Sequence, residues 1–402
     1  MKKYLILTIT SGNGHNSAAN AVKEALEKRG AGAKVVDVLK ELLGHKTLTW
    51  VYEKGYAHLC QHLQCAYNAY FRHYLKADPK NWKKAPIFSG VGNVFGKLLQ
   101  LVYEYQPDAI YSTHYLPAAL VSVLKQNYFI PAKSFAFVFD FTVCPFWECA
   151  TKNDYILVPN ASFVPKLEQK GYQKSQILPL GLTVREDFSV ELNKSKVLKS
   201  MGLEENVFTI MVMYGGGFWR GNYEIVKNII KNIKHKIQII VVNGKDKKSF
   251  ARIEKLKLPE NIKLVNIGYS NNVDVQMSAA DVMVGKAGGV SVSETLNKRL
   301  PLICCGKLPQ QEKNNIEMLK QEGASKQFVC KKQLIEILNN LIENPQELQT
   351  MQSNIDRIRK PFATRDLALL MLNSCADYSN TKPVDCKQVN KKIKQFLKQK
   401  EK

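Results

Sequence analysis

Two apolar strands, each followed by a glycine-rich turn and a helix, constrain the fold of this chain most. The first strand is predicted at Tyr4–Thr8, followed by the turn SGNGH at 11–15 and a helix at Ser17–Lys28. The second strand is predicted at Val207–Tyr214 and is followed by three glycines at 215–217. Strands that alternate with helices in this way favour parallel sheets covered by helices on both faces. The sequence therefore predicts an α/β chain with two doubly wound halves.

The length of 402 residues exceeds what one hydrophobic core usually organises, so two domains are expected. The boundary between the two halves is predicted near residues 185–205. The sequence contains no run of about 20 apolar residues, which is the length that a transmembrane helix needs. The apolar start at Met1–Thr10 is interpreted as a buried strand, because no cleavage pattern of small residues follows it.

The chain is strongly basic. Lysine and arginine total 58 against 35 acidic residues, a formal net charge of +23. This excess predicts an anionic partner, which is a nucleic acid, a membrane surface or a phosphorylated substrate. No nucleic-acid-binding motif is recognisable, so a nucleic-acid binder is the less favoured interpretation. The excess is densest in residues 381–402, where 8 basic residues face 2 acidic ones, a net +6.

The two glycine-rich turns are suited to a close approach by an anionic ligand, because each precedes a helix N-terminus. Neither turn fits the dinucleotide-binding or Walker pattern, which argues against a dehydrogenase and a P-loop NTPase. His15 lies at the tip of the first turn, where a histidine is a candidate general base. The other interpretation of His15 is a surface histidine or a capping histidine.

Two polar stretches follow predicted strands in the second half. The stretch from Lys286 to Glu294 contains Gly288 and Gly289, which are predicted to open a helix. A carboxylate near that helix start is stabilised by the helix dipole and is able to accept hydrogen bonds from a ribose diol. Amides and a carboxylate at 309–315 suit the hydroxyls of a sugar ring. The alternative for the stretch from Lys286 to Glu294 is a capped helix with an acidic residue near its N-terminus. The alternative for 309–315 is a polar connection between a strand and a helix.

These pieces, in this order, resemble the glycosyltransferase family of monogalactosyldiacylglycerol synthase and processive diacylglycerol glucosyltransferase. That family is related to the transferase that adds N-acetylglucosamine to lipid I. The resemblance extends over roughly residues 4–375. It implies a GT-B fold, with two Rossmann-like domains that face each other across a cleft. It also implies a UDP-sugar donor, no metal or other cofactor, and inversion at the anomeric carbon.

The resemblance assigns acceptor-side roles in the first half. It makes Gly14 part of the acceptor site and His15 a candidate catalytic base or acceptor-orienting group. Asp140, seven residues before Trp147, faces the acceptor by resemblance and is the second candidate base. Trp147 is assigned to the acceptor or membrane contact. Cys144 stands where close relatives often have a histidine.

In the second half the resemblance assigns the donor site. Tyr269 lies next to the uracil, Glu294 takes the ribose hydroxyls, and Lys286 or Arg220 meets the diphosphate. The full set of donor residues by resemblance is Gly215, Gly216, Gly217, Arg220, Tyr269, Lys286, Gly288, Gly289, Glu294, Gln311, Glu312 and Asn315. The sequence departs from the family pattern at Ala287, which replaces proline, and at Gln310, which replaces glycine.

The resemblance also organises the domains and the membrane-facing segments. It implies an N-terminal acceptor and membrane-binding domain at 1–190 and a C-terminal UDP-sugar-binding domain at 200–360. A helix at 361–380 returns to the first domain, and a basic tail occupies 381–402. The aromatic and basic insertion at 45–100 is interpreted as a membrane contact through Tyr70 and Trp82, with core packing as the alternative.

The tail is predicted to contain a short helix. Its apolar residues, Val389, Ile393, Phe396 and Leu397, fall on one face, with lysines elsewhere. Such a helix is typical of an interfacial membrane anchor, and the alternative is a solvated end.

The expected function is therefore an inverting hexosyltransferase that makes glycosyl-diacylglycerol. Its expected partners are UDP-glucose or UDP-galactose, diacylglycerol and an anionic membrane surface, with no nucleic acid. The expected location is cytoplasmic, with peripheral association at the cytoplasmic face of the membrane. The alternatives are a UDP-N-acetylglucosamine transferase acting on a polyprenyl-linked precursor and a sugar-nucleotide epimerase of the same fold.

Overall fold

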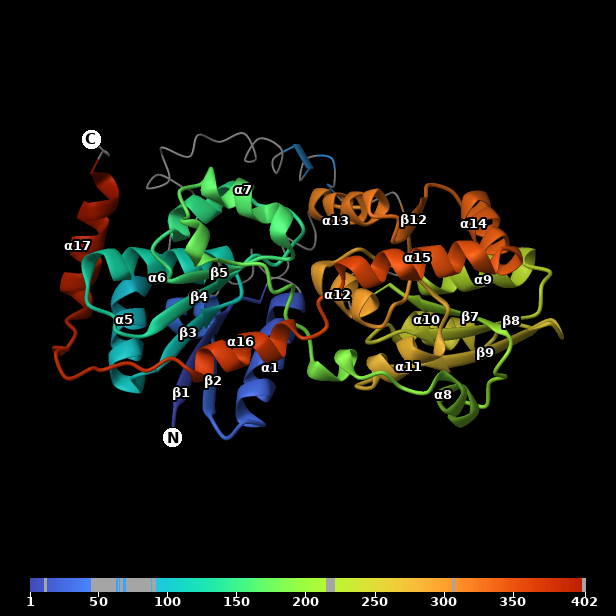
Figure 1. The fold of residues 1–402 in the computed structure, drawn as a ribbon, viewed down its shortest axis with the longest axis horizontal. Helices are drawn as coiled ribbons and strands as arrows, with labels where there is room; N and C mark the ends of the chain where they lie inside the picture. Colours follow the sequence, from blue (N-terminus) through green and yellow to red (C-terminus); the bar gives the residue numbers. More distant parts are fainter. Residues whose placement is uncertain are drawn as a thin grey trace. The chain divides into compact units, whose positions relative to one another are not determined.

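The chain folds into two compact units (Figure 1). The computed structural model describes residues 1–10, 13–44, 92–214, 221–305 and 308–399, with Leu63, Cys65, Asn68, Ala69 and Phe88. Unit 1 comprises Met1–Glu186 and Phe362–Lys402, and unit 2 comprises Asp187–Pro361. Unit 1 is therefore assembled from both ends of the sequence.

Unit 1 is built on a parallel sheet of six strands in the order β2-β1-β3-β4-β5-β6. The strands are β1 (Lys3–Thr8), β2 (Gly32–Asp37), β3 (Ala109–Ser112), β4 (Lys133–Phe137), β5 (Tyr155–Leu157) and β6 (Ile177–Leu178). The main helices are α1 (Gly14–Glu27), α5 (Val94–Tyr105), α6 (Tyr115–Asn127), α7 (Val164–Glu168), α16 (Ala363–Leu372) and α17 (Cys386–Lys398). Strand β2 lies on one side of β1, and the chain then returns to β3 on the other side of β1. The topological switch point therefore lies between β1 and β3.

Unit 2 contains a second parallel six-stranded sheet, in the order β12-β11-β10-β7-β8-β9. Its strands are β7 (Phe208–Met213), β8 (Ile237–Val242), β9 (Ile262–Ile267), β10 (Val282–Gly285), β11 (Leu302–Cys305) and β12 (Ser325–Phe328). Its helices are α8 (Lys194–Ser200), α9 (Asn222–Asn232), α10 (Lys247–Ile253), α11 (Val273–Ala279), α12 (Gly289–Asn297), α13 (Gln310–Gln321), α14 (Lys331–Glu343) and α15 (Pro345–Ile358). Here the switch point lies between β7 and β10.

Short helical turns complete the connections of the chain. They are η1 (Val38–Leu43), η5 (Pro145–Ala150), η6 (Ala161–Phe163), η7 (Lys174–Gln176) and η8 (Glu186–Ser189).

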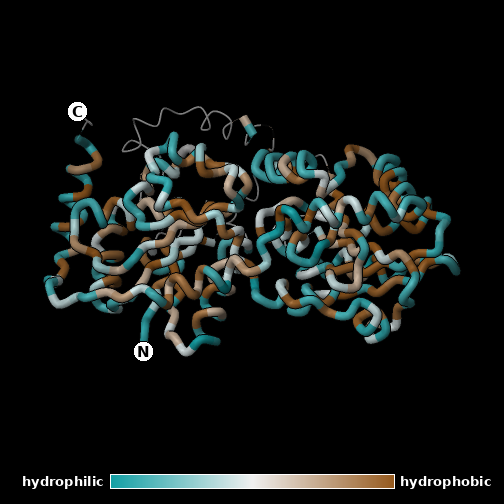
Figure 2. The backbone as a smooth tube through the Cα atoms, viewed as in Figure 1, coloured by the Kyte–Doolittle hydropathy of each residue, from teal (hydrophilic) through white to brown (hydrophobic). Residues whose placement is uncertain are grey.

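The strands are apolar because helices cover both faces of each sheet. All six residues of β8 are buried, and Tyr4–Leu7 of β1 are fully buried. Hydrophobic residues accordingly concentrate along the strands (Figure 2). The predicted α/β class with two doubly wound parallel sheets is confirmed.

The strands predicted at Tyr4–Thr8 and Val207–Tyr214 agree with β1 and β7 to within one residue. Strand β2 ends at Asp37. The Asp37 carboxylate accepts hydrogen bonds from the backbone N–H groups of Leu39 (3.0 Å) and Lys40 (3.1 Å). A side chain that caps a helical turn in this way ends the extended backbone.

The end of the chain packs on unit 1. Helix α16 contacts α1, and the Thr364 hydroxyl accepts a hydrogen bond from the backbone N–H of Val184 at 3.0 Å. Helix α17 packs on α5 and α6, with Val389 and Ile393 buried in the core. Phe396 and Leu397 are partly buried against the same core. The prediction of an interfacial anchor is therefore wrong for the apolar face of α17, which already covers the protein core.

No helix in the described part of the chain is long and apolar enough to cross a membrane.

Candidate functional site

His15 lies in the first turn of α1, just beyond the carboxyl end of β1. Its ring Nδ1 is 2.7 Å from the carbonyl oxygen of Thr113, which directly follows the neighbouring strand β3. Because a carbonyl oxygen only accepts hydrogen bonds, Nδ1 donates and carries the proton. Nε2 of the neutral ring therefore keeps its lone pair, and His15 is fixed in the tautomer that accepts at Nε2.

Aromatic rings enclose His15. The ring centroids of His15 and Phe139 are 4.0 Å apart, and the His114 ring meets His15 edge-on at 4.8 Å. Burial lowers the pKa of His15 to about 4, although its hydrogen bond to Thr113 opposes that shift. The pKa of His114 is also lowered, first by burial and then by proximity to His15. Both rings are therefore neutral at pH 7.

These depressed pKa values predict that the stability of unit 1 depends on pH. Between the ordinary histidine pKa of about 6.5 and the folded value of His15 of about 4, the unfolded chain binds more protons than the folded chain. The free energy of unfolding therefore has its full value above about pH 6.5 and decreases as the pH falls towards 4. The thermal midpoint of unit 1, followed by calorimetry, should fall between pH 7 and 5. The fall should be smaller in His15→Gln. An equal fall in that variant would contradict the lowered pKa of His15 as its cause.

A close approach explains Gly14. A Cβ atom at this position would lie 2.4 Å from Cζ of Phe139, far inside van der Waals contact. The ring of Phe139 thus lies directly on the turn that carries His15. Only glycine fits there without displacement of the ring.

A chain of hydrogen bonds fixes the same turn to three strands. The Thr113 hydroxyl donates to Thr8 (3.0 Å), and the Thr8 hydroxyl donates to the Asn16 side chain (3.0 Å). The Asn16 amide donates to Thr10 (3.1 Å), whose hydroxyl donates to Asp37 (2.5 Å). These bonds connect β1, β2, β3 and α1, so they position His15 through Asn16 and Thr113.

Asp140 is partly buried in the loop after β4, next to Phe139. Burial raises the pKa of the nearby Cys144 thiol to about 12, and the charge of Asp140 adds a smaller rise. Trp147 is 3% exposed, and its carbonyl oxygen accepts a hydrogen bond from the Tyr172 hydroxyl at 2.9 Å. The indole of Trp147 therefore offers no surface to a membrane, contrary to the prediction.

In unit 2, residues that follow β10 and β11 come together. Nζ of Lys286, directly after β10, lies 3.4 Å from Oε1 of Glu312 in the first turn of α13. Oε2 of Glu312 is buried and has no hydrogen-bond partner among the described residues. Asn315 is fully buried and donates from Nδ2 to the carbonyl oxygen of Ala287 at 2.8 Å. This bond fixes the turn between β10 and α12.

The same turn places the glycines and Glu294. Gly288 precedes the first residue of α12, and a Cβ there would lie 4.0 Å from Oε1 of Glu312. Gly289 is the first residue of α12 and is buried. Glu294 lies in the second turn, because the first turn of α12 contains no acidic residue. The helix dipole acts mainly on the first turn, so it stabilises the Glu294 carboxylate less than it would a carboxylate in that turn.

The remaining donor-site predictions have mixed outcomes. Tyr269 is 67% exposed just beyond β9, so its ring is open to a ligand. Gln311 is partly buried beside Glu312. Six predicted site residues lie outside the described part of the chain: Gly215, Gly216, Gly217, Arg220, Tyr70 and Trp82.

Three site residues were missed by sequence reasoning: His114, Phe139 and Tyr214. Tyr214 is buried after β7, and its hydroxyl has no hydrogen-bond partner among the described residues. Burial raises its pKa, and the charges of Cys304, Cys305 and Glu312 raise it further. A signal existed for two of them, since His114 and Tyr214 both follow strands that border a switch point.

Two family models match the chain. Residues 15–184 match the monogalactosyldiacylglycerol synthase family, and residues 209–366 match the glycosyltransferase family 28 C-terminal domain. The first match falls in unit 1, and the second falls almost wholly in unit 2.

Curated relatives match along most of the chain. A processive diacylglycerol β-glucosyltransferase of Bacillus pumilus is 26% identical over 373 residues, which is 91% of this chain and 93% of the relative. Monogalactosyldiacylglycerol synthase 1 of Arabidopsis thaliana is 25% identical over 385 residues, which is 90% of this chain and 69% of the relative.

A solved structure shares the fold. MurG of Acinetobacter baumannii superimposes with a TM-score of 0.62 at 12% identity, covering 92% of this chain and 99% of that protein. This similarity confirms the predicted GT-B fold.

Proposed function

Because the chain belongs to the glycosyltransferase family of monogalactosyldiacylglycerol synthases and processive diacylglycerol glucosyltransferases, we propose that it transfers a hexose from a UDP-sugar to diacylglycerol. The proposed donor is UDP-glucose or UDP-galactose, and the proposed place of reaction is the membrane surface. The names of the curated relatives support diacylglycerol as the acceptor.

The anchored imidazole of His15 is the observation that carries this proposal. It lies at the switch point of the unit that matches the monogalactosyldiacylglycerol synthase family, with Nε2 ready to accept a hydrogen bond. An acceptor hydroxyl bound there is oriented by Nε2. Asp140, in the loop that also carries Phe139, is the proposed base, and His15 is the alternative base.

The residues of unit 2 suit a sugar nucleotide. We assign the uracil to Tyr269, the ribose hydroxyls to Glu294, and the diphosphate to Lys286 with the open N-terminus of α12. Glu312 and Gln311 are assigned to the donor sugar, and Asn315 supports the donor site by fixing the turn before α12. The buried, unpartnered Oε2 of Glu312 supports this assignment, because a carboxylate oxygen without a donor gains a bond when a sugar hydroxyl reaches it.

In the proposed reaction the acceptor oxygen attacks the anomeric carbon from the face opposite UDP. The bond from that carbon to the diphosphate oxygen breaks, UDP leaves, and the hydroxyl proton passes to Asp140. The charge that grows on the diphosphate is met by backbone N–H groups of α12 and by Lys286. We propose that no metal takes part, and activity that survives a chelator would support this.

The anomeric configuration of the product tests this reaction. From an α-linked donor, inversion predicts a β-glycosyl-diacylglycerol, which proton NMR of the purified lipid identifies. An α-linked product would contradict inversion, and the absence of any glycolipid would contradict the function.

The ribose assignment predicts a binding defect in Glu294→Ala. Loss of two hydrogen bonds to a charged carboxylate should raise the Kd of UDP by about a hundredfold or more. Glu260→Ala, at an exposed position of unit 2, is the control and should bind normally. Calorimetry with UDP and 2′-deoxy-UDP separates the ribose contact from a general defect. If Glu294→Ala loses affinity for UDP and for 2′-deoxy-UDP by the same factor, Glu294 does not bind the ribose 2′-hydroxyl and the ribose assignment is wrong.

A further inference from the structure

Four lysines lie along one side of α17. We define the lysine face of α17 as Lys387, Lys391, Lys394 and Lys398. All four side chains are exposed, and none forms an ion pair with an acidic residue in the described part of the chain. Their spacing of three and four residues places them on one side of the helix, over a length of about 16 Å.

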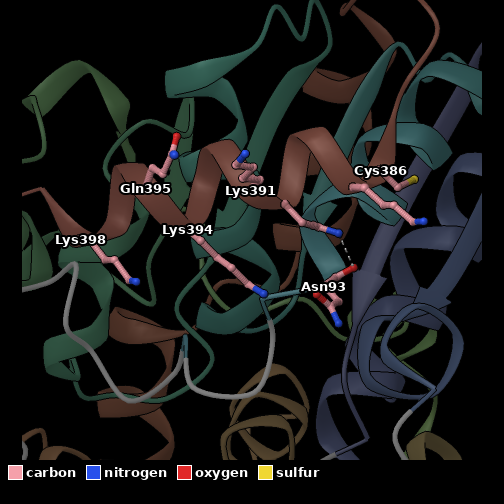
Figure 3. Close-up of a pocket in the computed structure, with 8 residues that line it drawn as sticks. Asn93, Cys386, Lys391, Lys394, Gln395 and Lys398 are labelled. Atoms are coloured by element: carbon pink, nitrogen blue, oxygen red, sulfur yellow. Dashed lines mark hydrogen bonds between the residues drawn. The ribbon is translucent and has the colours of Figure 1, made fainter.

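The lysine face borders a groove rather than a flat surface. The groove has a volume of about 540 Å³ and is lined by the four lysines with Asn93, Cys386, Asn390 and Gln395. Lys394 and Lys398 extend from the same side of the helix, and Lys394 points towards Asn93 (Figure 3). The stem of Lys394 crosses Gly92, where an added Cβ would lie 2.8 Å from Cε.

Helix α17 holds these lysines rigidly on unit 1. The Asn390 side chain accepts a hydrogen bond from the backbone N–H of Gly96 in α5 at 2.8 Å. A Cβ at Gly96 would lie 2.6 Å from the backbone of Cys386, so the two helices meet at backbone contact. On another side, Lys392 donates to the carbonyl oxygen of Asn127 at 3.0 Å and lies over the Tyr128 ring. The position of the lysine face is therefore set by the fold.

We propose that the lysine face of α17 docks unit 1 on a membrane by binding the phosphate groups of anionic phospholipids. The groove lining consists of lysine and small polar side chains, which suits phosphate oxygens. Among the described residues that line it there is no aromatic ring on which a nucleic acid base would stack, and this favours a lipid surface over RNA. The choice of a membrane rests on the proposed function, because the proposed acceptor is a lipid.

This docking differs from insertion of an amphipathic helix. The apolar face of α17 is occupied by the core of unit 1, so only its charged face meets the membrane. Binding by charge alone is expected to weaken steeply as the salt concentration rises.

The test uses the full chain and vesicles without any substrate. Partition is measured by co-sedimentation with vesicles of phosphatidylcholine and phosphatidylglycerol in equal parts, and with vesicles of phosphatidylcholine alone. Each lysine near an anionic surface contributes about fivefold to partition, so Lys394→Gln with Lys398→Gln should weaken binding about 25-fold. The fourfold variant, in which all four lysines of the lysine face are changed to glutamine, should bind still more weakly. Neither variant should change the weak binding to phosphatidylcholine.

A control separates the lysine face from net charge. Lys28, Lys152, Lys174 and Lys199 are exposed and form no ion pair with described residues. Changing these four to glutamine removes the same charge and should leave most of the vesicle binding intact. Equal losses in both fourfold variants would overturn the proposal, because the effect would then belong to net charge.

Two further results would also overturn it. One is displacement of the chain from vesicles by inorganic phosphate at low millimolar concentration, which would indicate a discrete anion site. The other is a variant with all four lysines of the lysine face changed to glutamine that loses binding to a polyuridine strand but still binds vesicles as the unaltered chain does. Transfer to diacylglycerol in neutral detergent micelles should be normal in the fourfold variant. A chain that binds vesicles through α17 yet transfers no sugar would refute the proposed function and leave the docking surface standing.

Discussion

Replacing Asp140 by asparagine is expected to lower kcat for transfer by about 10²- to 10⁴-fold. Asparagine keeps the size of the side chain, but its neutral amide accepts no proton. The acceptor hydroxyl would then attack without a base at its oxygen. UDP binding should be unchanged, because the residues assigned to the nucleotide lie in unit 2. Initial rates with saturating donor, together with calorimetry of UDP binding, check both parts.

His15→Gln is the companion variant for this prediction. Glutamine retains a hydrogen-bonding group but lacks the Nε2 acceptor that Thr113 fixes in place. An orienting role predicts a rise in KM for the acceptor with a smaller loss of kcat than in Asp140→Asn. If Asp140→Asn stays fully active while His15→Gln is inactive, the base is His15 and the assignment of Asp140 is wrong.

Replacing Glu312 by glutamine is expected to raise the KM for the UDP-sugar by about tenfold to a hundredfold. The change removes the ion pair with Lys286 and the charged acceptor that we assign to the sugar hydroxyls. A hydrogen bond to a charged group is worth about 1.5–3 kcal/mol, which corresponds to this range. The Kd of UDP without the sugar should change much less, because the nucleotide contacts remain.

The matched control for Glu312 lies on the same helix. Glu317 is exposed on α13 and pairs only with Lys320 among described residues, at 3.2 Å. Glu317→Gln should therefore leave the KM unchanged. If Glu312→Gln weakens UDP and the UDP-sugar by the same factor, the carboxylate contributes to nucleotide binding, and the sugar assignment fails.

The fold could be predicted from the sequence because its strands are buried on both faces. Runs such as Ile237–Val242 contain little but apolar residues, so strand positions and the parallel class follow from them. The short strand β12 was missed, since Ser325–Phe328 contains two polar residues in its centre. The apolar stripe of α17 was recognised, but a sequence alone does not distinguish packing on α5 from packing on a membrane.

The candidate site could be predicted in part. Gly14, Lys286 and Glu312 follow predicted strands, so their place at a sheet edge was foreseeable. The enclosure of His15 by Phe139 and His114 depends on three segments that are far apart in the sequence. No local pattern indicates that contact, and the lowered pKa of His15 follows from it.

Transfer from defined donors tests the central claim most directly. The purified chain is given UDP-glucose, UDP-galactose and UDP-N-acetylglucosamine in turn, with diacylglycerol in anionic vesicles, and the lipid products are identified by mass. We predict a glycosyl-diacylglycerol from UDP-glucose or UDP-galactose. Binding of UDP with no glycolipid from any of the three donors would contradict the account.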